Sequence, residues 1–303
     1  MTQKIVIICG PTGVGKTEIG LKLARDFNGE IISADSQQVY RGLDIGTAKP
    51  TKEEQSLVRH HLIDVVDPDE TFDLAQYVKL ADIAIKKIGQ NGILPIVVGG
   101  TGLYIKGLCH GISESTGRDA KYRDHLMELK KEKGVEALYR LLEEKDPETA
   151  SLLKPNDSTR IIRALEVFHV TGRSITVFNR EHGFKACRYR TLKIGLTIDR
   201  ADLYKRINER VDRMFEMGLL DEVGRLVEKY GADCPALKAV GYKEIANAIV
   251  PAGITVIDQI KQHTRNYAKR QLTWFKGDKE IVWFEPEHFG EIKKSVEDFL
   301  KRC

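Results

Sequence analysis

Short apolar runs alternate with segments of helical periodicity along most of the chain. The opening run at 4–10 (KIVIICG) is apolar and β-branched, and residues 17–27 then place apolar side chains on one helical face. Further short apolar runs, each ending in or directly followed by Gly, Asp or Pro, occur at 29–35, 60–66, 92–100, 192–199 and 280–286. Helical patterns occur at 73–90, 201–230, 241–249, 255–276 and 289–302. This alternation predicts an α/β fold with a doubly wound parallel sheet.

Residues 114–190 depart from this alternation. They carry helical patterns at 119–132, 135–144, 147–153 and 157–171, followed by a loop-rich tail, and they contain no buried strand. We therefore expect a helical insertion domain at 114–190, set within an α/β core that is formed by residues 1–113 and 191–303.

The composition excludes several classes of protein. The 303 residues are 42% hydrophobic and 30% charged, as in a soluble globular protein. No apolar stretch approaches the ~18 residues that a transmembrane helix needs, and the apolar start is too short for a signal peptide. The five cysteines form no C-x-x-C pair, which argues against a disulfide framework or a cysteine zinc site and favours the cytoplasm.

The net charge of +4 is too small to indicate a nucleic-acid partner by itself, but the charge is uneven. Residues 154–190 hold eight Lys and Arg against three Asp and Glu, and Lys261, Arg265 and Lys269 recur at helical spacing. Both segments are candidates for a nucleic-acid surface, with a solvated helix face as the alternative.

The strongest local motif is GPTGVGKT at residues 10–17, which matches G-x-x-x-x-G-K-[ST] between a predicted strand and a predicted helix. In such a loop, backbone N–H groups and the helix dipole face phosphate oxygens, Lys16 adds a point charge, and the Thr17 hydroxyl can bind Mg²⁺. The alternative is a chance glycine turn. The acid and base-reading motifs of nucleotide hydrolases are missing, so the motif indicates a polyphosphate site without specifying a nucleotide.

Polar residues follow two of the predicted central strands. Asp35 stands at the carboxyl edge of the sheet, where open α/β sheets bind ligands. It is a candidate general base or a metal ligand through water, and a turn or helix N-cap is the alternative. Thr101, in VGGTG, could face a ligand at the same edge or could belong only to a tight turn.

Several motifs occur together, in the order GPTGVGKT, ISADSQQVYRGLDIGTAKP, HHLID, VGGTGLYI, NDSTRIIRALEV, AVGYKE and TRNYAKRQLTWF. Together they resemble the bacterial tRNA dimethylallyltransferase family, over residues 10–275. The resemblance implies a P-loop NTPase-like core that transfers a dimethylallyl group from dimethylallyl diphosphate. The acceptor would be the exocyclic amine of the adenine 3′ of the anticodon in tRNA. It also implies Mg²⁺ as the cofactor and no membrane partner, and it is compatible with a monomer.

The resemblance also assigns roles to residues. The diphosphate would lie on the phosphate loop, which comprises Gly10, Pro11, Thr12, Gly13, Val14, Gly15, Lys16 and Thr17. Asp35 matches the general base and Arg210 an arginine that assists the diphosphate, so that the catalytic set is Asp35, Thr101, Lys16 and Arg210. The contacts to tRNA would come from Asp35, Ser36, Gln37, Gln38, Thr101, Arg123, Thr159, Arg160, Ile161, Ile162 and Arg163. Thr159 and Ile162 replace two glutamines of the family pattern, which removes their side-chain amides.

Three other functions fit parts of the pattern. A small-molecule kinase could use the phosphate loop for ATP, but it gives no reason for ADSQQVY and VGGTGLYI. A free-adenylate isopentenyltransferase has a similar core, whereas the basic segments favour a macromolecular acceptor. An RNA-binding module with a vestigial loop would not need Lys16, Thr17 and Asp35. We further expect an apolar channel for the prenyl tail between Asp35 and the phosphate loop, and we expect Trp274 and Phe275 to be core residues.

Overall fold

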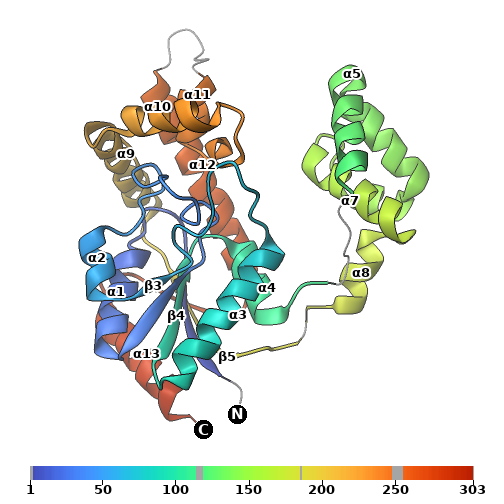
Figure 1. The fold of residues 1–303 in the computed structure, drawn as a ribbon. Coiled ribbons are helices and arrows are strands. Elements are labelled where there is room, and N and C mark those ends of the chain that lie inside the picture. The colour runs from blue at the N-terminus through green and yellow to red at the C-terminus, as the bar shows by residue number, and fades with distance from the viewer. Residues whose placement is uncertain (1–2, 114–118, 185, 248–254, 303) are drawn as a thin grey trace. The chain divides into compact units, whose positions relative to one another are not determined.

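Six parallel strands form one sheet in the computed structural model, which describes residues 3–113, 119–184, 186–247 and 255–302 (Figure 1). Their order across the sheet is β3 (His60–His61), β2 (Gly29–Ser33), β4 (Leu94–Gly99), β1 (Lys4–Cys9), β5 (Arg190–Leu196) and β6 (Ile281–Phe284). The predicted parallel sheet is confirmed. Since parallel strands end at the same edge, the segments after β1, β2 and β4 meet there.

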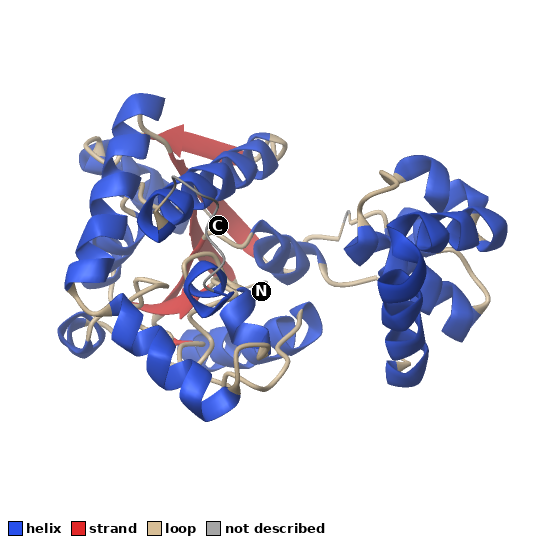
Figure 2. Ribbon diagram, turned by 90° about the horizontal axis from the view of Figure 1, so that it is seen from above, coloured by secondary structure: helices blue, strands red, loops and turns tan. Residues whose placement is uncertain are grey.

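Helices cover both faces of this sheet, as a doubly wound fold requires (Figure 2). On one face lie α1 (Lys16–Asp26), α9 (Arg200–Glu216) and α13 (Phe289–Lys301), and on the other lie α3 (Leu74–Gln90) and α4 (Gly102–His110). Side chains of β1 point alternately to the two faces of the sheet. Val6 and Ile8 pack with α1 and α9 on one face, and Ile5 and Ile7 are buried on the opposite face.

The remaining helices of this part of the chain are α2 (Lys52–Leu57), α10 (Leu219–Tyr230), the short 3₁₀ helix η1 (Pro235–Lys238), α11 (Tyr242–Asn247) and α12 (Val256–Lys276). The α2 helix was not anticipated, although Thr51 and Glu54 form a capping box at its start. The predicted helix 241–249 extends beyond the described residues, because α11 is described only to Asn247.

The chain divides into two compact units. One consists of Met1–Cys109 together with Arg188–Cys303, and the other is His110–Cys187, which overlaps the segment 114–190. The second unit contains α5 (Ala120–Lys145), α6 (Pro147–Leu152), α7 (Ser158–Thr171) and α8 (Ile175–His182). Leu126, Leu138, Leu142, Ile161 and Leu165 are buried in its core.

Three of the predicted elements are wrong in extent. The strand expected at 60–66 is only two residues long, because Leu62 and Asp64 adopt positive φ angles of 63° and 55°, which a strand cannot contain. The helix expected at 201–230 breaks into α9 and α10 at Gly218, whose φ is 94°. The loop expected after residue 171 contains α8, which is capped by Ser174.

In the described residues, no helix is both long enough and apolar enough to cross a bilayer.

Candidate active site

The phosphate loop joins β1 to α1 with its glycines in conformations that other residues avoid. Gly10 and Gly15 have φ angles of 144° and 99°, and a Cβ on Gly10 would lie 2.7 Å from the Leu196 carbonyl oxygen. Gly15 is also the N-cap of the eleven-residue helix α1, and it has no side chain to cap the helix. The first amides of α1 therefore remain available to an anion at this end of the helix.

Lys16 is a half-buried cation at the start of α1. Its Nζ donates a hydrogen bond to the Pro11 carbonyl oxygen at 2.7 Å. Burial lowers its pKa from 10.5 to about 8, the nearby Asp35 carboxylate opposes that shift, and Arg210 adds to it. An anion bound here would relieve the unfavourable burial of the charge.

Arg210, on α9, is a second half-buried cation beside the loop. Its Nη1 donates to the Thr12 hydroxyl at 3.2 Å, and its Nη2 donates to the Thr47 carbonyl oxygen at 3.5 Å. Burial lowers its pKa, and Asp35 raises it. The two cations and one carboxylate thus share one small space.

Asp35 follows β2 and closes a tight turn. Its Oδ1 accepts hydrogen bonds from the amides of Gln37 at 2.8 Å and Gln38 at 3.4 Å. Asp35 is therefore a turn residue, which was the alternative to a functional role. The two roles are compatible, because Asp35 also lines the first cavity. The Thr101 hydroxyl, two residues after β4, accepts from the Ser36 amide at 3.0 Å and so fixes the start of this turn.

Two cavities meet at Asp35. One, of about 300 Å³, is lined by phosphate-loop residues and reaches Ile31 and Val98. The other, of about 330 Å³, opens toward η1 and α11. Both are lined by Thr12, Asp35, Thr47, Arg210 and Tyr267. A cavity therefore exists between Asp35 and the phosphate loop, where the sequence predicted a channel. Its lining combines apolar and polar groups.

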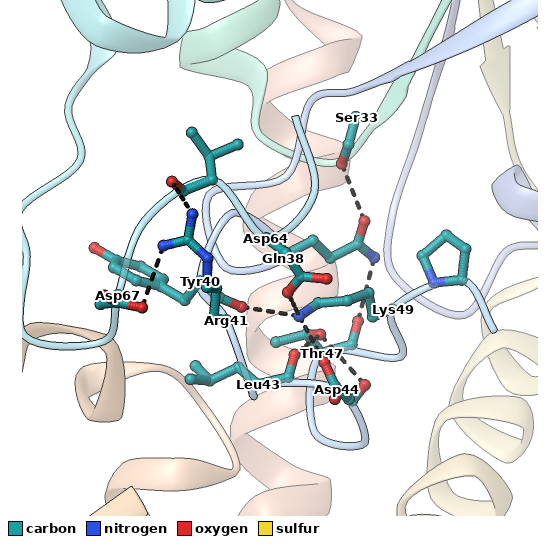
Figure 3. Close-up of polar contacts among 12 residues, drawn as sticks. Ser33, Gln38, Tyr40, Arg41, Leu43, Asp44, Thr47, Lys49, Asp64 and Asp67 are labelled. Atoms are coloured by element: carbon teal, nitrogen blue, oxygen red, sulfur yellow. Dashed lines mark hydrogen bonds and ion pairs between the residues drawn. The ribbon is translucent and has the colours of Figure 1, made fainter. Parts of the chain in front are cut away.

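Gln38 lies in the first cavity, and Ser36 and Gln37 line the second. The side chain of Gln38 is held at both of its amide atoms. Its Oε1 accepts from the Ser33 hydroxyl at 3.0 Å, and its Nε2 donates to the Thr47 carbonyl oxygen at 3.5 Å (Figure 3). The same Nε2 lies 3.3 Å from the Ala48 carbonyl oxygen, which also accepts from it. The segment after β2 therefore brings its predicted site residues together.

Helix α12 supplies site residues that the sequence reasoning did not identify. Gln271 is only 6% exposed: its Oε1 accepts from the Thr12 amide at 2.8 Å, and its Nε2 donates to the Gly100 carbonyl oxygen at 2.9 Å. Tyr267 forms hydrogen bonds with Thr101 and Gln271, and burial raises its pKa. The available signal was the motif TRNYAKRQLTWF, in which both residues lie.

The structure confirms one of the predictions made for the other residues of α12 and contradicts two. Phe275 is buried as expected, but Trp274 is 45% exposed, so its placement in the core was wrong. Lys261 pairs with Asp212 at 2.6 Å, and Arg265 donates to Asn208 at 2.7 Å, so these two cations bind α9. The expected basic face of 261, 265 and 269 is therefore not a continuous exposed stripe.

The predicted residues of the helical unit form a separate group. Arg123 Nη1 lies 2.8 Å from Oε2 of the buried Glu166, and Arg163 lies 4.0 Å from the same atom. Arg160 is exposed and pairs with Asp157 at 3.0 Å, and Thr159 is exposed beside it. Ile161 and Ile162 are buried in the core of this unit, so their side chains are not on its surface.

No group of three or more His, Cys, Asp or Glu side chains suited to a metal occurs in the part of the chain that the structure describes. His60 and His61 turn to different partners, the Val58 carbonyl oxygen and the Glu30 carboxylate. A metal at the phosphate loop would have the Thr17 hydroxyl and the Asp35 carboxylate nearby, because both line the same cavity.

The likeness to known proteins extends over the whole chain. The profile of one family, IPP transferase, matches residues 38–278. The protein named tRNA dimethylallyltransferase 1 in Pelobacter propionicus is 48% identical over 98% of both chains. The one named tRNA dimethylallyltransferase in Geobacillus thermodenitrificans is 46% identical over 96% of this chain and 94% of its own.

Two solved structures are also similar to nearly the whole chain. The full-length tRNA isopentenylpyrophosphate transferase of Bacillus halodurans is 42% identical, with a TM-score of 0.72 over 99% of this chain and 97% of its own. A eukaryotic dimethylallyltransferase acting on tRNA is 29% identical, with a TM-score of 0.79 over 98% of this chain and 78% of its own. With its phosphate loop, its sheet and its full-length relatives in agreement, the chain belongs to the IPP transferase family.

Proposed function

We propose that this protein transfers a dimethylallyl group from dimethylallyl diphosphate to the exocyclic amine of the adenine 3′ of the anticodon in tRNA. The observation that carries the proposal is the position of Asp35, which borders both the phosphate-loop cavity and the cavity beside it. Two substrates can thus approach one carboxylate from two sides. The names of the full-length relatives support the same reaction.

The donor would bind by its diphosphate. The loop amides, Lys16 and Arg210 face the first cavity, and they would stabilise the charge that grows on the diphosphate as the allylic C–O bond breaks. Mg²⁺ fits this site because Thr17 offers a hydroxyl and the diphosphate would supply further oxygens, and it would neutralise charge on the leaving group. The prenyl tail would extend toward Ile31 and Val98.

The acceptor would enter from the second cavity. An exocyclic adenine amine is a weak nucleophile, because its lone pair is delocalised into the ring. Asp35 would take a proton from this amine as the C–N bond forms and diphosphate leaves. Thr101 would keep Asp35 in place through the Ser36 amide. Alignment of the two reactants supplies a large part of the acceleration.

The tRNA would also be bound through contacts other than those to the target adenine. We assign this role to the helical unit 110–187, through Arg123, Thr159, Arg160 and Arg163, and to Ser36, Gln37 and Gln38 beside the site. The adenine must leave its stack in the anticodon loop, which costs a few kcal/mol and less than in a duplex.

The test compares acceptors. The protein is incubated with Mg²⁺ and labelled dimethylallyl diphosphate, and with an anticodon stem-loop, the same stem-loop with purine in place of the target adenine, or AMP. We expect label only in the adenine stem-loop, since purine lacks the amine. Label in AMP alone would assign the protein to free-adenylate prenyl transfer. Turnover of ATP with no prenyl transfer would assign it to the kinases.

A further inference from the structure

The segment between β2 and α2, residues 34–51, carries Asp35, Gln38 and Thr47 to the active site with almost no regular structure to support it. It contains turns and a single bridge, from Tyr40 to Val66. A loop of this length exchanges among many conformations unless side chains fix it. The buried side chains of Val39, Tyr40 and Leu43 pack its middle, and polar contacts fix the rest.

Lys49 is the centre of those contacts. Its ammonium group binds Asp44 Oδ1 at 2.6 Å, Asp64 Oδ1 at 2.5 Å and the Tyr40 carbonyl oxygen at 2.8 Å (Figure 3). The side chain is only 3% exposed. All three hydrogens of the ammonium therefore have an acceptor, and these acceptors come from the middle of the loop and from the segment after β3.

The backbone just before Lys49 holds two site residues. Gln38 donates to the Ala48 carbonyl oxygen at 3.3 Å, and Arg210 donates to the Thr47 carbonyl oxygen at 3.5 Å. Ala48 has a φ of 46°, a left-handed conformation that an alanine keeps only when its surroundings impose it. Backbone hydrogen bonds from Ala48 to Ile45 and from Lys49 to Asp44 hold this turn to the residues before it, and the Lys49 side chain ties it to Tyr40 and Asp64.

A buried carboxylate fixes the middle of the same loop. Glu222, on α10, accepts hydrogen bonds from the amides of Asp44, Ile45 and Gly46 at 2.9–3.3 Å. Asp44 is thus held by its amide at Glu222 and by its carboxylate at Lys49. Glu222 fixes residues 44–46, and the Lys49 side chain adds contacts that tie the following turn to Tyr40 and Asp64.

We propose that Lys49 is a positioning residue for the transfer reaction, because it fixes the Thr47–Ala48 turn on which Gln38 and Arg210 rest. The inference deepens the proposed function and rests on it. Lys49 lines neither of the two cavities at Asp35. Its removal should act through Arg210 on the diphosphate and through Gln38 on the space beside Asp35.

The test variant is Lys49→Met, and Lys193→Met is its matched control. Lys193 is equally buried, at 3% exposure, and it also binds two carboxylates, Asp278 and Glu280, both at 2.8 Å. It lines neither of the two cavities at Asp35. Both variants lose a buried ion pair, so both should unfold at a lower temperature than the wild type. Only Lys49→Met should also lose the contacts that hold the loop 34–51.

Two measurements are made on the folded fraction of each variant. For Lys49→Met we expect kcat/KM for the prenyl donor to fall between about tenfold and a hundredfold, since misplaced groups cost rates of this size. We also expect weaker binding of inorganic pyrophosphate, which depends on Arg210 and not on the transfer. Lys193→Met should change neither quantity.

The inference is overturned if Lys49→Met and Lys193→Met show the same kcat/KM and the same affinity for pyrophosphate. Failure of the proposed function is a different result, because the wild-type protein itself would then transfer no prenyl group to the stem-loop. In that case the binding of pyrophosphate tests the positioning role of Lys49. If only Lys49→Met binds pyrophosphate more weakly, the role is supported, and if both variants bind it equally well, the role is rejected.

Discussion

The side-chain amide of Gln271 accepts a hydrogen bond from the backbone amide of Thr12 at 2.8 Å, and its other end donates to the Gly100 carbonyl oxygen at 2.9 Å. One residue of α12 therefore joins the phosphate loop to the end of β4. Two strand ends that carry predicted catalytic groups are thereby held in one arrangement, by a residue that is far from both in sequence.

Replacing Gln271 should weaken use of the donor. Gln271→Leu leaves the Thr12 amide and the Gly100 carbonyl group buried without a partner, at about 1–3 kcal/mol each. We expect kcat/KM for the prenyl donor to fall by about tenfold to a hundredfold, measured by steady-state kinetics. Gln262→Leu, at an exposed position of the same helix, is the control. Equal kinetics in the two variants would remove Gln271 from the site.

The pKa of Lys16 predicts a pH dependence. It is lowered to about 8 because the ammonium is buried, so the group is charged below pH 8 and neutral above it. We expect kcat/KM for the donor to fall as pH rises above 8, by about tenfold per unit, since this quantity reports the free enzyme.

In Lys16→Arg the plateau should be lower and the fall should vanish up to pH 10, because a guanidinium stays charged there. A wild-type profile that stays flat to pH 10, or an unchanged fall in Lys16→Arg, contradicts the assignment.

Gly99 should be intolerant of a side chain. A Cβ there would lie 2.1 Å from the Ala34 carbonyl oxygen, which is a backbone atom next to Asp35. We expect Gly99→Ala to lower the free energy of unfolding by about 1–3 kcal/mol in urea titrations. Gly224→Ala, on the open side of α10, meets nothing within 4 Å and should raise it by about 0.5–1 kcal/mol. Equal stability of both variants would argue against the close approach.

Binding of the stem-loop should depend on salt and on the helical unit. If Arg160 contacts phosphates as proposed, binding would release counterions, so affinity should fall steeply as salt rises, and Arg160→Ala should reduce the slope by about 1. Lys133→Ala removes an exposed charge of α5 as a control. Filter binding over a salt series measures both slopes. Identical slopes in wild type and Arg160→Ala would exclude Arg160 from the interface.

Much of the site could be predicted because it is local. The phosphate loop needs only its glycines, Lys16 and the strand and helix on either side, all within a few residues. The proximity of Asp35 to Thr101 follows from parallel strands that end at one edge, and the Thr101–Ser36 hydrogen bond realises it.

The rest depends on packing between distant segments. An amphipathic pattern shows that α12 has a buried face, but it does not show that Gln271 turns toward Thr12 or that Trp274 stays exposed. Ile161 and Ile162 matched a tRNA-contacting stretch in sequence, yet the core of the helical unit takes both side chains. The two-residue strand β3 ends at left-handed residues, which no hydrophobic pattern reveals.

The central claim is that Asp35 removes the proton from the adenine amine during prenyl transfer, and a single-turnover comparison of wild type with Asp35→Asn tests it most directly. The variant keeps the shape of the side chain and loses the base, so both substrates should bind with near wild-type affinity. We predict a rate of label transfer to the stem-loop that is about 10²–10⁴-fold lower. Transfer by Asp35→Asn at the wild-type rate, with both substrates bound, would contradict the account.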